Sequence, residues 1–289
     1  MAKEQSEVKK RGYFASTWHR LCKNRLTVAG MVILALFILA AVFADVIAPY
    51  PYGKQDLRSI GLGPSSAHLF GTDNLGRDLF SRVIYGARVS LQIGFVSTMI
   101  SLIFGGILGA ITGFYAGKAD MIIMRIIDMM MAIPAVLLAI VISASLGPGV
   151  RNLMIAIGIS SIPSYTRIIR ASILSLRGDE YIEAARLCGD SDFRIIWRHI
   201  FPNILAPVIV QVTLGMALAI LNASSLSFLG LGVQPPQPEW GSMLASGRSY
   251  IRQYPHIVVF PGLAIALLVL SLNMIGDGLR DALDPRMKN

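Results

Sequence analysis

The chain has 289 residues, of which 54% are hydrophobic and 15% charged, and its mean hydropathy is +0.61. These values exclude an ordinary water-soluble domain, because the long uncharged runs exceed what a soluble core accommodates. The formal net charge of +9 would suggest a nucleic-acid partner in a soluble protein. Here the basic residues flank apolar runs, where Lys and Arg act as orientation signals, so no nucleic-acid partner is expected. The composition predicts an all-α membrane protein that contacts lipid.

Six largely uncharged runs are candidates for membrane-spanning helices, because about 20 apolar residues cross a bilayer. The fourth run is the weakest, since it has only 15 residues before Arg167, and we extend it to Leu174. This extension requires Arg167 and Arg170 to reach the cytoplasmic headgroups with their long side chains. We therefore predict six transmembrane helices, over residues 27–44, 89–117, 129–150, 152–174, 200–238 and 253–276.

The distribution of Lys and Arg predicts the orientation of these helices. With the N-terminus inside, 18 of the 26 Lys and Arg residues lie in cytoplasmic segments. Such an excess is typical of the cytoplasmic side of membrane proteins. An even number of spans then places both the N-terminus and the C-terminus in the cytoplasm.

The first outer loop ends in a segment with amphipathic spacing, residues 71–86. Asp73 or Asn74 can cap a helix at this point. Such a helix would lie along the membrane surface or pack on a neighbouring subunit, and the pattern favours neither. The apolar face would hold Leu75, Leu79, Phe80, Val83 and Ile84, and the opposite face Arg77, Asp78, Ser81 and Arg82.

The cytoplasmic loop over residues 176–202 is too long for a simple connection and is patterned as two short helices. Asp179 can cap the first helix and Gly189 can end it. A second helix would follow and be limited by Pro202. A helix of this kind can seat in a cleft on a partner, and the alternative is a solvated linker between two spans.

One motif in this loop has the spacing of a known functional element. Glu183, Ala184 and Ala185 are followed by Gly189 after three residues and by Pro202 after twelve more. This pattern resembles the EAA loop of ABC importer permeases.

Three further segments are similar to the C-type permease subunit of the dipeptide, oligopeptide and nickel import systems. They are residues 71–91, 225–241 and 276–286, in the order found in that family. The loop departs from the usual pattern at two positions, where His199 replaces a common isoleucine and Phe201 a common leucine.

The resemblance implies a type I ABC importer permease fold with six transmembrane helices. The chain would be the permease subunit that forms, with a second homologous permease subunit, the path for short peptides into the cytoplasm. Nickel or another small solute is the alternative cargo. Two cytoplasmic ABC ATPase subunits and an extracytoplasmic solute-binding protein would complete the importer in the bacterial cell (inner) membrane. The residues that would couple ATPase and spans are Glu183, Ala184, Ala185, Gly189 and Pro202.

The predicted spans and this resemblance together give a division of the chain into five parts. They are a cytoplasmic basic tail (1–25), a transmembrane anchor (26–48), an external loop with the amphipathic helix (49–88), a permease core (89–281) that includes the coupling loop 176–202, and a cytoplasmic C-terminus (282–289).

No motif for ATP binding or catalysis is present in the sequence. It lacks the G-x-x-x-x-G-K-[ST] phosphate loop as well as the H-E-x-x-H, C-x-x-C and G-x-S-x-G patterns. We expect a non-catalytic subunit with no metal site or cofactor of its own, in which ATP and Mg bind to the partner ATPase subunits. A membrane signalling or scaffold subunit, or an intramembrane enzyme, is the alternative from another class.

Polar and small residues inside the predicted spans are the remaining candidates. Asn222, Ser224 and Ser225 would line a substrate path or serve helix packing. Arg125 and Asp128 are three residues apart, which predicts an ion pair near the cytoplasmic headgroups. Small-residue spacing predicts a close helix approach at Gly105, Gly106, Gly109 and Gly113.

Overall fold

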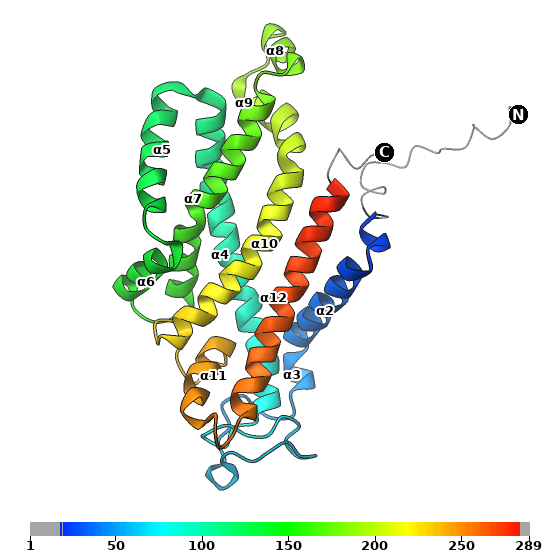
Figure 1. Ribbon diagram of the computed structural model, residues 1–289, viewed down its shortest axis with the longest axis vertical. Coiled ribbons are helices and arrows are strands. Elements are labelled where there is room, and N and C mark those ends of the chain that lie inside the picture. The colour runs from blue at the N-terminus through cyan, green and yellow to red at the C-terminus, as the bar shows by residue number, and fades with distance from the viewer. Residues whose placement is uncertain (1–17, 19, 284–289) are drawn as a thin grey trace, which may run out of the picture.

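The computed structural model describes residue 18 and residues 20–283, and this part of the chain is helical, with no β-strand (Figure 1). Most of the predicted basic tail and residues 284–289 lie outside the described residues. The long helices are α2 (Arg25–Val42), α4 (Leu79–Tyr115), α7 (Val150–Leu176), α10 (Phe201–Phe228) and α12 (His256–Leu283). The shorter elements are α3 (Ala44–Ile47), η1 (Leu57–Ser59), α5 (Gly117–Met131), α6 (Ala135–Leu146), α8 (Glu180–Leu187), α9 (Asp192–Ile195), η2 (Ile196–Ile200), α11 (Trp240–Gly247) and η3 (Arg248–Tyr250).

The long helices run roughly along the long axis of the molecule (Figure 1). The segment between α3 and α4 lies with α11 at one end, and α8 lies at the opposite end. The first residues of α2 and the last residues of α12 point toward the end that carries α8. The start of α2, the end of α12 and helix α8 therefore lie toward the same end of the protein.

The number of spans is close to the predicted six. Four helices are long and apolar enough to cross a membrane, namely α2, α4, α12 and the continuous helix Asp192–Phe228, and the bent pair of α5 and α6 makes five. Helix α7 is also long, with 27 residues, but it contains Arg151, Arg167 and Arg170. The count of six is therefore approximate.

The predicted third span over residues 129–150 is not one continuous helix. Helix α5 ends at Met131, α6 begins at Ala135, and the two are bent by 88°. Pro134 lies at the break, where it has no backbone N–H to donate and disfavours helical geometry at Ile133.

Helices α4 and α7 approach each other closely along a line of glycines in α4. A Cβ atom at Gly105 would lie 2.6 Å from the Cβ of Tyr165, and one at Gly109 would lie 2.8 Å from the carbonyl oxygen of Thr166. Gly113 is similarly close to α7. A Cβ at Gly106, in contrast, would make only an ordinary contact. The predicted close approach is confirmed for three of the four glycines.

Gly109→Val is expected to destabilise the protein, while Gly106→Val is not. The extra methyl groups at position 109 would press on the backbone of α7, and overpacking of this kind costs about 1–3 kcal/mol. Thermal unfolding of the two purified variants in the same detergent measures the difference. Equal melting temperatures for the two variants would show that α4 and α7 can move apart without loss of stability.

The predicted amphipathic surface helix is also wrong. Residues 79–86 form the first turns of α4, which continues without a break to Tyr115. The charged side chains Asp73, Arg77, Asp78 and Arg82 are buried inside the protein. The amphipathic pattern correctly indicates an apolar and a polar face. The segment between α3 and α4 covers the polar face, and this face therefore contacts neither water nor lipid.

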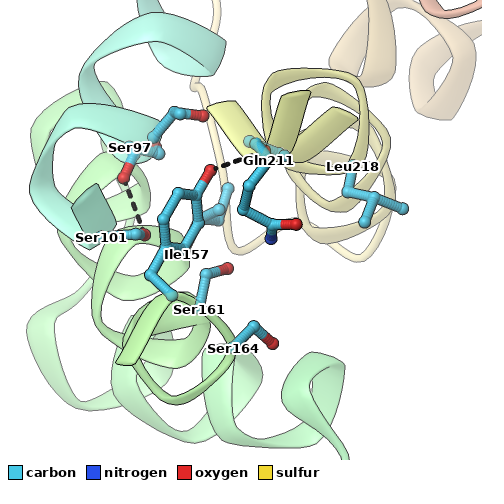
Figure 2. A pocket seen from close by; sticks show the side chains of 11 residues that line it. Ser97, Ser101, Ile157, Ser161, Ser164, Gln211 and Leu218 are labelled. Atoms are coloured by element: carbon cyan, nitrogen blue, oxygen red, sulfur yellow. Dashed lines mark hydrogen bonds between the residues drawn. The ribbon is translucent and has the colours of Figure 1, made fainter. Parts of the chain in front are cut away.

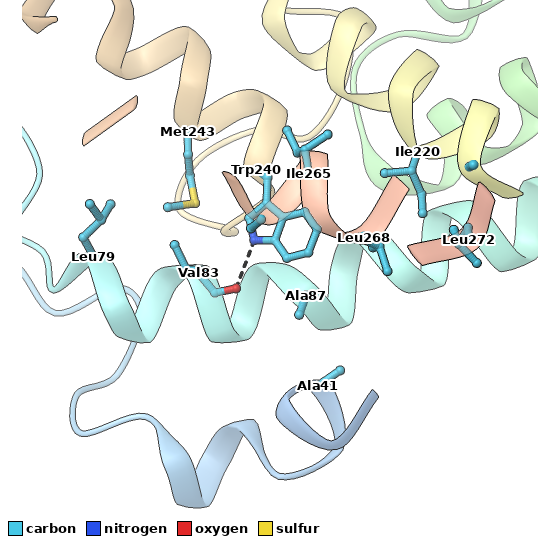
Figure 3. Close-up of a cluster of buried hydrophobic side chains, with 12 residues drawn as sticks. Ala41, Leu79, Val83, Ala87, Ile220, Trp240, Met243, Ile265, Leu268 and Leu272 are labelled. Atoms are coloured by element: carbon cyan, nitrogen blue, oxygen red, sulfur yellow. Dashed lines mark hydrogen bonds between the residues drawn. The ribbon is translucent and has the colours of Figure 1, made fainter. Parts of the chain in front are cut away.

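An apolar cluster at this end of the molecule packs α11 against α4 and α12 (Figure 3). Trp240 is fully buried, and its indole Nε1 donates a hydrogen bond to the carbonyl oxygen of Val83 at 3.0 Å. Gly86 leaves room for the ring, since a Cβ there would lie 2.7 Å from it. Trp240 is therefore a core residue whose polar N–H has a hydrogen-bond partner.

Candidate functional site

The predicted coupling loop forms the short helix α8, followed by α9 and η2. Gly189 ends α8 with a φ of +85°, and the N–H of Asp190 donates to the carbonyl of Ala185 at 3.1 Å. This left-handed conformation is the usual helix stop that glycine permits. The predicted cap by Asp179 is not formed by its side chain, whereas Ser191 accepts from the N–H of Arg194 and starts α9.

Helix α8 has one face toward the protein and one face toward the outside. Ile182 and Ala185 are buried, whereas Glu183 and Ala184 are exposed, and Leu187 has 89% of its surface accessible. The two alanines of the motif thus have different roles. Ala185 lets α8 pack on the protein, and Ala184 leaves a smooth outer face next to Glu183.

The inner face of α8 packs into an apolar cluster shared with the long helices. The cluster includes Phe114 at the end of α4, Ile173 near the end of α7 and Ile204 near the start of α10. The guanidinium of Arg186 also lies 5.1 Å from the ring centroid of Phe114. The side-chain amide of Asn203 in α10 donates to the Tyr181 hydroxyl at 3.5 Å. Helix α8 is thus linked directly to α4 and α10, and its buried residues share one apolar cluster with the end of α7.

Pro202 does not limit the second helix of the loop as predicted. A continuous helix runs from Asp192 to Phe228. Residues Ile196–Ile200 form a single π-turn before the proline, and Pro202 lies in the first turn of α10. A π-turn shifts the hydrogen-bond register, which lets a helix accommodate a residue without an N–H.

Beside this loop, α5 and α7 are joined by two ion pairs. Asp128 binds Arg167 at 2.6 Å, and the carboxylate of Asp120 binds Arg170 with two hydrogen bonds of 2.7 Å each. The predicted pair of Arg125 with Asp128 is therefore wrong, because Asp128 has its partner on another helix. Arg167 and Arg170 bind these acids across the helix interface, which neutralises charge near the end of α7.

The three residues predicted for a substrate path do not form a common surface. The backbone of Ser224 packs tightly against Gly241 of α11. Ser225 donates its hydroxyl to the carbonyl of Leu221 within α10 at 2.9 Å, and Asn222 is half-buried. Their role in a path stays a prediction.

A polar pocket lies nearer the middle of the molecule, between α4, α7 and α10 (Figure 2). Its volume is about 50 Å³. Tyr165 crosses the pocket and donates its hydroxyl to the carbonyl of Gln211 at 3.2 Å. The polar lining consists of Ser97, Thr98, Ser101, Ser161, Ser164, Tyr165 and Gln211.

One side of this pocket opens on the surface of the chain. Ser164 is exposed, Ser161 and Gln211 are half-buried, and Figure 2 shows their side chains pointing into one space between α7 and α10. Exposed polar groups in the middle of long apolar helices are costly against lipid. In the sequence, Gln211 is a polar residue within a long uncharged run, which indicates this face. The predicted substrate path did not include it.

Comparison with known proteins assigns the chain to a family. Residues 105–289 match the model of the binding-protein-dependent transport system inner membrane component. The chain belongs to this family. Residues 12–64 match a second model, the N-terminal transmembrane domain of oligopeptide transport permease C.

Curated relatives of this permease family align with nearly the whole chain. A dipeptide transport system permease protein of Alkalihalophilus pseudofirmus is 51% identical and covers 93% of this chain and 89% of its own length. A di/tripeptide transport system permease protein of Pseudomonas aeruginosa is 48% identical, with 94% and 92% covered. A glutathione transport system permease protein of Pectobacterium atrosepticum is 44% identical, with 94% and 91% covered.

Solved structures of permeases show the same fold. The methionine ABC transporter MetNI in an inward-facing conformation gives a TM-score of 0.58 at 16% identity, with 70% of this chain and 97% of that chain covered. An amino acid ABC transporter solved with histidines gives a TM-score of 0.56 at 16% identity, with 71% and 95% covered. The permease thus has the predicted type I fold of ABC importers.

Within this permease, reversing the charge of Arg170 is expected to weaken the contact between α5 and α7. Hydrogen bonds to charged groups contribute roughly 1.5–3 kcal/mol, and Arg170→Asp would also set two acids against each other. The exchanged pair Asp120→Arg with Arg170→Asp should recover most of the lost thermal stability. Arg167→Gln, at the more exposed pair, should have a smaller effect. A double variant no better than the single one would contradict the pairing.

Proposed function

We propose that this permease subunit belongs to an ATP-driven importer and forms, with a second homologous permease subunit, the path for short peptides into the cytoplasm. Two cytoplasmic ABC ATPase subunits would bind ATP and Mg, and an extracytoplasmic solute-binding protein would deliver the peptide. Support for the peptide cargo comes from the relatives, whose names include dipeptide, di/tripeptide and glutathione transport.

The construction of α8 is the single observation that carries the coupling role. Its outer face presents Glu183, Ala184 and Leu187, while its buried residues belong to an apolar cluster with the ends of α4, α7 and α10. A partner that binds the outer face would therefore act on this cluster and, through it, on the helix ends that form it. We assign coupling to Glu183, Ala184, Ala185 and Gly189.

A natural thiol allows a direct test of the partner. Cys188 is exposed at the end of α8, and Cys22 is exposed at a distance from it in sequence. In the complete transporter with Cys22→Ser, a short bifunctional maleimide should join Cys188 to an ATPase subunit, and Cys188→Ser should remove the product. Cross-linking that persists in Cys188→Ser, or no cross-link in either protein, would contradict the proposal.

The proposed orientation is tested by reporters fused within the chain. Fusions after Lys118 or Asp190 should behave as cytoplasmic, and a fusion near Asp56 should behave as external. This follows from the excess of Lys and Arg on the proposed cytoplasmic side. The reversed pattern would show that α8 faces away from any cytoplasmic ATPase.

A further inference from the structure

Two buried hydroxyl groups in the pocket between α4, α7 and α10 have no partner among the described residues. The side chains of Ser97 and Thr98 line the pocket, and the residues are only 1% and 3% exposed. Neither hydroxyl oxygen makes a hydrogen bond of ordinary distance and angle, and the Thr98 hydroxyl lies next to that of Tyr165. A buried hydroxyl left without a partner is unfavourable, and the great majority of such groups in proteins are hydrogen-bonded.

Two other polar side chains of the pocket, Ser101 and Tyr165, are held in place by hydrogen bonds to neighbouring helices. Ser101 donates to the carbonyl of Gly158 at 2.7 Å, and Tyr165 donates to that of Gln211. Gly215 lies directly under the Tyr165 hydroxyl, where a Cβ atom would clash with it. The tyrosine is therefore fixed between α4 and α10, and the unpartnered hydroxyls form a rigid binding surface.

The chemistry of the lining defines what the pocket can bind. None of its residues is charged, and each polar group is a hydroxyl or an amide. Such a set offers no opposite charge to pair with a buried carboxylate, ammonium or metal ion, so it favours an uncharged group. Hydroxyls and an amide side chain donate to and accept from a neutral group equally well. The ligand is thus a neutral group with hydrogen-bonding atoms.

The size and position of the pocket narrow the class of ligand further. A volume of about 50 Å³ admits a few water molecules or one planar amide, but no large side chain. The opening is flanked by Ser164 and by Leu218, which is 59% exposed. A chain that lies along this opening can insert a main-chain amide while its side chains stay outside.

We propose that this pocket binds a main-chain amide of the transported peptide, with Ser97 and Thr98 as its hydrogen-bonding partners. The inference rests on the proposed peptide cargo. It predicts that the transporter recognises the peptide bond and tolerates different side chains. Water, like an amide, is neutral and both donates and accepts hydrogen bonds. Occupation of the pocket by water alone is therefore the competing outcome.

The test compares Ser97→Ala and Thr98→Val with the unchanged transporter, in the complete complex. Uptake is measured with labelled dialanine and with its analogue methylated at the peptide nitrogen. Each variant should raise the KM for dialanine about fivefold, the effect of one neutral hydrogen bond. Because the analogue has already lost the amide donor, its KM should change much less.

Thermal stability separates binding from a structural role. Removing an unpartnered hydroxyl should leave the melting temperature unchanged or raise it. Ser172→Ala, whose hydroxyl binds the carbonyl of Ile168 outside the pocket, is the matched control and should leave KM unchanged. Unchanged KM in both pocket variants would refute amide binding and indicate water alone. Failure of the unchanged transporter to take up dialanine would instead refute the peptide cargo itself.

Discussion

Replacing Gly189 with proline is expected to abolish peptide uptake while leaving the protein inserted in the membrane. Proline requires a φ near −65°, whereas Gly189 has +85° and donates its N–H to the carbonyl of Arg186 at 3.0 Å. The substitution would therefore change the direction in which the chain leaves α8. Uptake should fall to background in the complete transporter, and ATP hydrolysis should lose its dependence on peptide.

Two substitutions serve as controls for this result. Gly189→Asn should retain much of the uptake, because asparagine adopts the left-handed conformation more readily than other residues. Gly178→Ala lies at the other end of α8, where a Cβ atom meets nothing within 4 Å, and should be neutral. If Gly189→Pro transported peptide normally, the geometry of α8 would have no part in coupling.

A charge reversal at Glu183 tests the outer face of the same helix. Glu183 is exposed, so Glu183→Lys should leave the fold intact. A partner surface fitted to the acid would be repelled, and uptake and peptide-stimulated ATP hydrolysis should both be lost. Normal uptake by Glu183→Lys, with the variant present in normal amount, would remove this residue from the coupling surface.

The second large effect is expected at Asp73, in the segment before α4. Its carboxylate binds Arg77 Nε at 2.6 Å, lies 3.5 Å from Arg82 Nε and accepts from the N–H of Leu75 at 2.8 Å. Asp73→Ala would leave two guanidinium groups buried without their anion. Breaking a buried ion pair in this way costs about 3–5 kcal/mol, a large part of the stability of a typical domain.

An exposed ion pair at the same end of the molecule provides the comparison. Asp45 binds Arg88 at 3.1 Å, and both side chains are largely accessible. Asp45→Ala should therefore change the melting temperature little. Thermal unfolding of the two alanine variants in one detergent measures the contrast, and equal small shifts would show that the buried cluster does not hold the outer segment in place.

Much of the fold follows from local properties of the sequence. Long uncharged runs predicted α2, α4, α10 and α12, because a helix is the form in which an apolar segment satisfies its backbone in lipid. The predicted end of α8 at Gly189 is confirmed as well, since a left-handed helix stop is a local requirement.

The structure differs from the predictions mainly where distant parts of the chain meet. The acids that bind Arg167 and Arg170 lie 39 and 50 residues earlier in the chain, so no local spacing indicates the pairs. The burial of Arg82 depends on the loop that covers it. The polar pocket is assembled from three helices, and a serine in one of them resembles any other helix-packing serine.

The most direct test of the whole account is transport by the complete complex in proteoliposomes. The permease, its partner permease, the two ATPases and the binding protein would be combined with labelled dialanine outside and ATP on the cytoplasmic side. We expect dialanine to accumulate only when both ATP and the binding protein are present, and we expect excess nickel not to reduce this accumulation. ATP hydrolysis without dialanine accumulation, or accumulation of nickel instead, would contradict it.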